Sequence, residues 1–195
     1  MKFKVLTVFL FFFSFAFAQK PCKLALDVKD SIGVFKETKN CLVYEKVFGN
    51  SAQLIFLTLA SDNDVPYIKL QIIQKSKDFI TPKCLETNSK LFFQLSNGKI
   101  YTLINANEGS CDKFIYNELD KENNRFLEAN YLFLKNDFED LKKYSISLMK
   151  IHFSSGEVDY VLPKEIVSEK VETTSRPEDF FRENFNCIFT PDIAK

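Results

Sequence analysis

Residues 52–74 read AQLIFLTLA-SDND-VPYIKLQIIQ and contain the clearest structural pattern of the chain. In the second half, Ile68, Leu70 and Ile72 alternate with Tyr67, Lys69 and Gln71, a period of two that is typical of a half-buried β-strand. The first half, AQLIFLTLA, is apolar on both faces, as expected of a central strand. The intervening SDND has turn chemistry, so the two strands are predicted to form an antiparallel hairpin.

A second hairpin is predicted at residues 91–104, LFFQL-SNGK-IYTLI. Asn97-Gly98 is the strongest signal for a two-residue type I′ turn, and we place these two residues at the tip. This register puts the apolar side chains on one face. The expected opposing pairs are Leu95 with Ile100, Phe93 with Thr102, and Leu91 with Ile104.

A third hairpin is predicted at residues 147–162, SLMKIHF-SSGE-VDYVL, with Ser155-Gly156 at the tip. A shift by one residue would mix apolar and polar side chains on both faces, so the pattern supports this register. The apolar face then pairs Met149 with Leu162, Ile151 with Tyr160, and Phe153 with Val158. The largely polar face pairs Lys150 with Val161, His152 with Asp159, and Ser154 with Glu157.

Helical signals are few. Asn136–Glu139 is similar to a capping box, and the basic residues Lys142 and Lys143 suit the end of a short helix. Ser175–Glu178 is a second helix start, and we expect the phenylalanines that follow it, Phe180, Phe181 and Phe185, to seal the sheet. Residues 164–175 are interpreted as a mobile connector or a peripheral strand. The fold class is therefore mainly β, at the margin of α+β: an antiparallel sandwich or open barrel with one or two short helices.

The first 18 residues have the three parts of a secretory signal peptide. A cationic start, Met1–Lys4, precedes the apolar run Val5–Phe13, and an Ala-x-Ala ending predicts cleavage between Ala18 and Gln19. A membrane anchor needs about 20 apolar residues, and a lysine at position 20 comes too early for that. We therefore expect residues 1–18 to be removed and residues 19–195 to form a single β-rich domain in the periplasm or outside the cell.

The chain expected after cleavage is almost neutral. Loss of Lys2 and Lys4 leaves 24 basic and 26 acidic residues, which gives no electrostatic footprint for nucleic acid or for an anionic membrane surface. No later apolar run is long enough to span a bilayer. Cys22 would be acylated in a lipoprotein, but Lys20-Pro21 lack the small residue that such processing needs, so a soluble product is expected.

The chain has five cysteines, and an oxidising destination predicts two disulfides and one remaining thiol. Cys84 and Cys111 would stand opposite each other if the second hairpin extended without a bulge, so we expect a disulfide between them. Such a bridge would contribute on the order of 3 kcal/mol. Cys41 with Cys187 is the second pairing that we expect, and Cys22 with Cys41 is its rival.

His152 is the only histidine, and its expected neighbour Asp159 would complete half of a Ser-His-Asp arrangement. No Gly-x-Ser-x-Gly motif marks an activated serine, so the pair is interpreted as an exposed ion pair and no catalytic residue is assigned. The usual zinc spacings and phosphate-binding glycine motifs are absent from the sequence, so no metal or cofactor is expected. Asp62–Asp64 has oxygen ligands of a calcium-loop kind but is better explained as a hairpin tip.

The last third of the chain contains a predicted strand, a short Asp-Leu helix and a hairpin, with the residues Tyr131-Leu132-Phe133-Leu134, Asp140-Leu141, Ile146, Ile151, Gly156, Tyr160 and Asn186-Cys187-Ile188. In these residues it resembles a group of small uncharacterised exported proteins of Gram-negative bacteria. The resemblance implies export and no particular activity.

Three functional hypotheses remain from the sequence. The first is a non-enzymatic periplasmic or extracellular β domain that binds an envelope protein or a glycan. The second is a small secreted hydrolase that uses His152 with Asp159, or an unidentified pair of carboxylates. The third is a structural or accessory component of the envelope, which would have no ligand pocket.

Overall fold

The structure is a computed structural model and describes residues 24–189. The expected signal peptide, its cleavage site and Cys22 lie outside the described residues. Strands account for 58% of the described residues and helices for 10%, so the predicted mainly β fold is confirmed.

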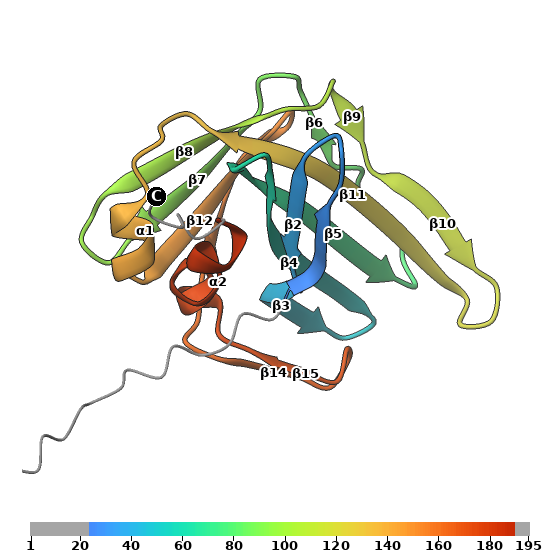
Figure 1. The fold of residues 1–195 in the computed structure, drawn as a ribbon. Coiled ribbons are helices and arrows are strands. Elements are labelled where there is room, and N and C mark those ends of the chain that lie inside the picture. Colours follow the sequence, from blue (N-terminus) through green and yellow to red (C-terminus); the bar gives the residue numbers. More distant parts are fainter. Residues whose placement is uncertain (1–23, 190–195) are drawn as a thin grey trace, which may run out of the picture.

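One antiparallel sheet contains most of the strands (Figure 1). Its members are β1 (Leu24–Lys29), β2 (Val34–Thr38), β3 (Cys41–Phe48), β4 (Ser51–Asp62), β5 (Val65–Ser76), β7 (Lys90–Leu95), β8 (Ile100–Asn105), β10 (Lys113–Asn117), β11 (Glu122–Phe133), β12 (Ile146–Phe153) and β13 (Gly156–Val161). Two small sheets pair β6 (Cys84–Leu85) with β9 (Ser110–Cys111), and β14 (Ile166–Ser168) with β15 (Thr173–Ser175). The helices are α1 (Glu139–Lys143), α2 (Phe180–Ile188) and a 3₁₀ turn at Pro177–Asp179.

The large sheet folds over on itself to form the two walls of a sandwich. The first wall contains β1 to β5, β10 and β11, and the second contains β7, β8, β12 and β13. The two walls share one ladder, in which Tyr131–Phe133 of β11 pair with Leu103–Asn105 of β8. The order of strands begins at β1 and ends at β13, which do not pair, so the sheet of the described residues does not close into a barrel, and the fold is consistent with the predicted sandwich.

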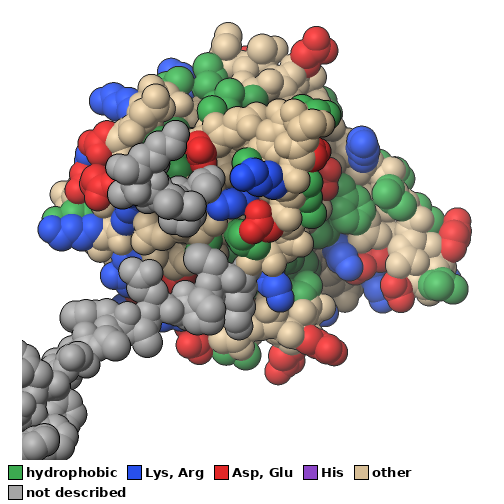
Figure 2. Space-filling model, in the orientation of Figure 1, with side chains coloured by type: hydrophobic (Ala, Val, Ile, Leu, Met, Phe, Trp, Pro, Cys, Tyr) green, Lys and Arg blue, Asp and Glu red, His purple; other side chains and the backbone are tan. Residues whose placement is uncertain are grey.

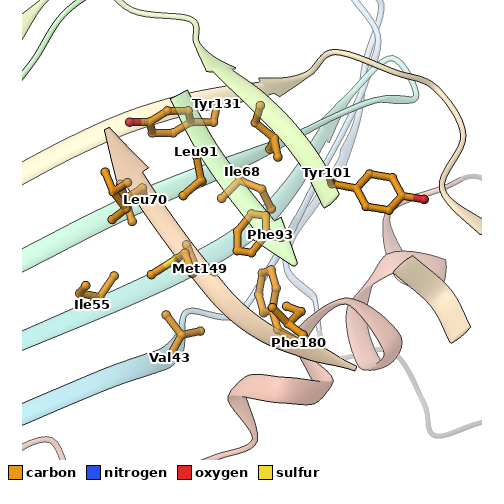
Figure 3. Close-up of a cluster of buried hydrophobic side chains, with 14 of the residues drawn as sticks. Val43, Ile55, Ile68, Leu70, Leu91, Phe93, Tyr101, Tyr131, Met149 and Phe180 are labelled. Carbon is orange, nitrogen blue, oxygen red and sulfur yellow. The ribbon is translucent and has the colours of Figure 1, made fainter. Parts of the chain in front are cut away.

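The hydrophobic core fills the space between the two walls (Figure 3). Ile55 and Leu70 of the first wall are buried against the same cluster as Phe93 and Met149 of the second. Two tyrosine rings also join the walls, since Tyr44 of β3 and Tyr160 of β13 meet edge to face with centroids 4.9 Å apart. Burial of apolar side chains from both walls is therefore what holds the sandwich together.

The β4–β5 hairpin forms as predicted from residues 52–74. Its two-residue tip is Asn63-Asp64, and both residues have positive φ angles, 49° and 62°. Two successive residues of this kind make a type I′ turn, whose twist matches that of the flanking strands. The predicted turn chemistry of Asp62–Asp64 is confirmed.

The register predicted for the β7–β8 hairpin is wrong by one residue. The tip has three residues, Ser96–Gly98, with Gly98 at φ 83° and Leu95 N donating to Lys99 O. This is the type I turn followed by a left-handed bulge residue, which competes with the two-residue turn expected for Asn-Gly. The slip reverses the faces of β8, so Tyr101 and Leu103 face the core and Ile100 is exposed.

The register predicted for the β12–β13 hairpin is wrong by two residues, because the tip is Ser154-Ser155. Met149 pairs with Tyr160, and Ile151 pairs with Val158. A shift by two keeps every side chain on its expected face, so the polarity pattern could not distinguish the two registers. The expected inward face, including Met149, Ile151 and Tyr160, is indeed buried.

Helix α2 closes one end of the sandwich, as predicted from its phenylalanines. Phe180, Phe181 and Phe185 are all at most 1% exposed. The ring of Phe181 meets Phe93 of the second wall edge to face, with centroids 5.0 Å apart. On the first wall, Ser61 Oγ donates to the backbone oxygen of Ile188, 2.8 Å away.

The remaining C-terminal elements differ slightly from expectation. Helix α1 begins at Glu139, the last residue of the predicted start Asn136–Glu139, and its N-cap residue Phe138 makes no side-chain capping bond. Residues 164–175 contain the β14–β15 hairpin, so the peripheral-strand alternative is correct. This hairpin lies against β3, where Ser175 Oγ donates to the backbone oxygen of Leu42.

Candidate ligand-binding site

The end of the sandwich opposite helix α2 contains a cavity of about 590 Å³. Strand β4 shows the relation between the two ends: Ser61, near its C-terminus, contacts α2, and Ser51, at its N-terminus, lines the cavity. We call this space the open-end cavity. The β3–β4 turn region, the end of β5, the segment 79–83 and the tip of the β12–β13 hairpin surround it.

The inward face of the first wall changes from apolar to polar where it reaches this cavity. Ile55 of β4 and Ile72 of β5 are paired and buried in the core. Two positions further along the strands, on the same face, Gln53 pairs with Gln74. The same row continues through Lys46 of β3 and Arg125 of β11. Gln53, Gln74 and Arg125 are half-buried and Lys46 is exposed. Polar groups that are partly removed from water cost free energy unless they find partners, so a polar row on an otherwise apolar face indicates a site.

The lining of the open-end cavity is rich in hydrogen-bonding groups. Its amides are Gln53 and Gln74, and its hydroxyls are Ser51, Ser76, Thr81 and Ser155. Its lysine residues are Lys46, Lys75 and Lys83, and among residues 24–189 no aspartate, glutamate or histidine belongs to the lining. Such a set can donate and accept hydrogen bonds but contains no general acid or base with an ordinary pKa near neutrality.

Some of these polar groups already have partners. Gln53 Nε2 donates to the Tyr160 hydroxyl across the two walls, at 3.3 Å. The hydroxyls of Ser51 and Ser76 lie 2.9 Å apart. Burial raises the pKa of Tyr160, and its bond from Gln53 opposes that shift in part. The phenol therefore stays protonated and can itself donate a hydrogen bond.

Two phenylalanine rings lie at the rim of the open-end cavity. Phe48 is 81% exposed and Phe79 is 79% exposed, although both line the cavity. Phe48 ends β3, and Phe79 lies in the segment that follows β5. Large apolar side chains that stay in water at the mouth of a polar cavity are typical of contact surfaces.

The segment that forms one side of the cavity is held by a buried ion pair. Arg125 Nη1 lies 2.7 Å from Asp112 Oδ1, and Arg125 Nε donates to the backbone oxygen of Ile80 at 2.8 Å. Asp112 Oδ2 also accepts from the backbone N–H of Lys83 at 2.8 Å. The exposed fractions of the Arg125 and Asp112 side chains are only 12% and 2%. This segment therefore has a fixed position before any ligand arrives.

Lys83 is partly enclosed at the side of the cavity. Its Nζ lies over the ring of Phe153, 4.6 Å from the centroid, a cation–π geometry. Burial lowers the pKa of Lys83, and the charge of Asp112 raises it to a smaller extent. The first effect follows from the partial removal of the cation from water, and the second from the nearby negative charge.

The predicted pair His152 and Asp159 lies elsewhere, on the outward face of β12–β13. The structure places His152 opposite Glu157 and Asp159 opposite Lys150, so the predicted opposition of the pair is wrong because of the shifted register. Lys150 Nζ lies 3.1 Å from Glu157 and 3.6 Å from Asp159. Neither His152 nor Asp159 lines the open-end cavity, and the lining supplies no pair of carboxylates.

The cysteines are arranged partly as expected. Cys84 and Cys111 lie opposite each other at disulfide distance, as predicted. Cys41 is a free thiol, so its expected pairing with Cys187 and the rival pairing with Cys22 are both wrong. Cys187 is disulfide-bonded. Burial, and to a smaller extent the charge of Glu183, raises the pKa of Cys41 to about 12.

Sequence reasoning did not identify the residues of the open-end cavity. A signal was nevertheless present, because the inward series Ile68, Leu70, Ile72 ends in Gln74. The neighbouring strand shows the same change at Gln53. Polar residues that interrupt an inward series at the same row of two paired strands indicate the position of a site.

Within residues 24–189, no helix combines the length and the apolar character needed to cross a membrane. No family model, no curated protein and no solved structure matches this chain.

Proposed function

We propose that this chain is an exported, non-enzymatic β domain that binds a glycan of the cell envelope in the open-end cavity. The observation that carries the proposal is the lining of this cavity, which combines amides, hydroxyls and ammonium groups without a carboxylate or an imidazole. These groups can hold a ligand rich in hydroxyls, because each sugar hydroxyl both donates and accepts. A binding role follows, since the lining lacks a group that would move a proton at neutral pH.

Two features support a glycan over an envelope protein. The exposed rings of Phe48 and Phe79 offer flat apolar faces at the mouth, against which the C–H face of a sugar ring can pack. The polar row made by Gln53 and Gln74 lies deeper, where it can bond to hydroxyls of the same ligand. A cavity of about 590 Å³ also suits a short stretch of sugar units better than a folded protein surface.

Export is supported by the sequence and by one feature of the structure. The first 18 residues have the pattern of a signal peptide. Cys84 and Cys111 lie at disulfide distance, and disulfides persist in oxidising compartments such as the periplasm. Detection of a chain that begins at Gln19 in a periplasmic or culture fraction is the direct test.

The binding proposal is tested by titration of the purified chain with short neutral and acidic oligosaccharides, followed by calorimetry and NMR. We expect Gln74→Ala to weaken binding about fivefold, the effect of one lost hydrogen bond. Gln71→Ala is the matched control, because Gln71 lies on the outward face of the same strand and bonds to Glu128. Equal affinities of the two variants, or no binding of any oligosaccharide, would overturn the proposal.

The hydrolase alternative is separated from binding by His152→Ala. Because His152 lies on the outward face of β12, this variant should bind oligosaccharides like the unmodified chain. Product analysis of the same mixtures detects any cleavage. Hydrolysis that disappears in His152→Ala, with the fold intact, would favour the enzyme.

A further inference from the structure

We infer that the glycan bound in the open-end cavity is acidic, with carboxylate or phosphate groups that pair with Lys46 and Lys83. The inference rests on the proposed function and names the class of ligand. Its basis is that two cations from separate elements line the cavity: Lys46 comes from β3, in the same row as Gln53, and Lys83 from the segment before β6. Lys75 also belongs to the lining, but strand alternation places its side chain on the outward face of β5.

The charge of this cavity departs from that of the chain as a whole. The sequence contains 26 basic and 26 acidic residues. On the face shown in Figure 2, acidic and basic side chains lie side by side. The lining of the open-end cavity, by contrast, has three lysines and no acidic residue. The excess of positive charge is confined to this cavity. It therefore acts on a ligand inside the cavity and does not attract ligands from a distance.

The three lysines also lack counter-charges of their own within the described residues. Outside the cavity, Lys99 and Lys150 each contact two carboxylates, whereas other lysines such as Lys113 form no ion pair with the described residues. No carboxylate oxygen of the described chain lies within 4.0 Å of the ammonium groups of Lys46, Lys75 or Lys83. Asp112, the nearest candidate for Lys83, is committed to Arg125. An anionic ligand would therefore meet cations that are free to pair with it.

A neutral ligand would fit this lining less well. It would take water away from the ammonium groups without supplying negative charge, and an unpaired charge is expensive to desolvate. Lys83 is already partly buried over the ring of Phe153. An acidic group beside it would form a charge-assisted hydrogen bond, which is about twice as strong as a neutral one.

A cavity of this size favours an acidic glycan over a nucleic acid. The nucleic acid alternative needs a basic surface that follows a phosphate backbone over many units. Here the basic groups are confined to the end of the sandwich, and the chain carries no net charge. Binding to an oligonucleotide is therefore an outcome that the experiment must include.

The test uses the chain expressed with its own first 18 residues and purified after export. It is titrated with a short oligogalacturonate and with the fully methyl-esterified form of the same oligosaccharide, which has the same length and no charge. A phosphorylated mannose oligosaccharide distinguishes phosphate from carboxylate. We expect the acidic forms to bind at least about tenfold tighter, and the difference to shrink in high salt.

Variants that each remove one lysine charge show which lysines cause the preference for the acidic probe. Lys46→Gln should weaken binding of the acidic probe about threefold, and Lys83→Gln about tenfold, with little change for the neutral probe. Lys113→Gln is the matched control, because Lys113 lies on β10 away from the cavity. Circular dichroism checks the fold of each variant. Lys46→Gln retains the test if Lys83→Gln does not fold.

The possible outcomes separate the two proposals. Equal binding of the acidic and esterified probes, both weakened by Gln74→Ala, would overturn the charge inference and leave glycan binding intact. Binding of neither probe would overturn both. Tighter binding of an oligonucleotide with the same number of charges, lost in the lysine variants, would replace the acidic glycan with a nucleic acid.

Discussion

Arg125 and Asp112 form an ion pair that joins strand β11 to the segment on one side of the open-end cavity, with their nearest nitrogen and oxygen 2.7 Å apart. Each partner makes a second bond to the backbone of that segment, Arg125 to Ile80 and Asp112 to Lys83. The position of the cavity wall therefore depends on two side chains that no sequence motif connects.

Asp112→Asn should destabilise the fold by about 3 kcal/mol, because it leaves the buried guanidinium of Arg125 without its counter-charge. Urea unfolding followed by circular dichroism gives this free energy. The paired variant Arg125→Met with Asp112→Leu should recover part of the loss, since both charges are then removed. A single variant as stable as the unmodified chain would contradict the structural role of the pair.

Cys84→Ala combined with Cys111→Ala should lower the free energy of unfolding by about 3 kcal/mol. The bridge joins residues 27 positions apart and so limits the freedom of the unfolded chain. Thermal unfolding with and without reductant provides the measurement. Peptide mapping without reduction should show the Cys84–Cys111 link and a second linked peptide that contains Cys187. Cys41→Ala is the control, because this residue forms no bridge.

Cys41 should resist alkylation in the folded chain. Its pKa is raised from 9.0 to about 12, so below pH 9 almost none of the folded protein carries the reactive thiolate. Because the folded state holds the proton more tightly than the unfolded state, this contribution to stability is complete below pH 9 and is lost as the pH rises toward about 12. Iodoacetamide labelling followed by mass spectrometry measures the reactivity. Rapid labelling of the native chain below pH 9 would show that the thiol is not buried.

Tyr131→Phe should stabilise the fold by about 1 kcal/mol, because its hydroxyl is buried without a hydrogen-bond partner among the described residues. The side chain is fully buried, and burial raises its pKa. Tyr160→Phe is the matched control, since that hydroxyl accepts from Gln53 and its removal should not stabilise. Thermal melts compare the variants. A lower melting temperature for Tyr131→Phe would indicate that the phenol has a structural role.

Strand alternation was sufficient to predict the hairpins and the fold class, because one face of each strand is buried. It could not define the register of a hairpin in which the number of turn residues sets the pairing. Asn97-Gly98 allowed both a two-residue and a three-residue tip, and only the backbone geometry around Gly98 distinguishes them. The error at this tip changed which residues of β8 face the core, because the shift was odd.

The predicted pairing of Cys84 with Cys111 is correct although the register from which it was derived is not. Between the tip and the cysteines, the ladder gains one residue: Lys90 pairs with Ile104, but Leu85 pairs with Ser110. The one-residue shift at the tip and this extra residue offset each other, so Cys84 lies opposite Cys111. The open-end cavity was not predictable in the same way, because it brings together Gln53, Lys83 and Ser155, whose proximity depends on how the two walls fold over one another.

The single ladder between the walls, at Tyr131–Phe133 and Leu103–Asn105, lies at the end that helix α2 occupies. The two walls are thus joined by strand pairing at the phenylalanine-filled end and are not paired at the rim of the open-end cavity. At the rim, Gln53 of the first wall donates to the Tyr160 hydroxyl of the second, and Ser154 N donates to Cys84 O of the small β6–β9 sheet. A bulky guest that widened the rim would have to break these bonds and separate the rings of Tyr44 and Tyr160, while every strand would keep its paired neighbours.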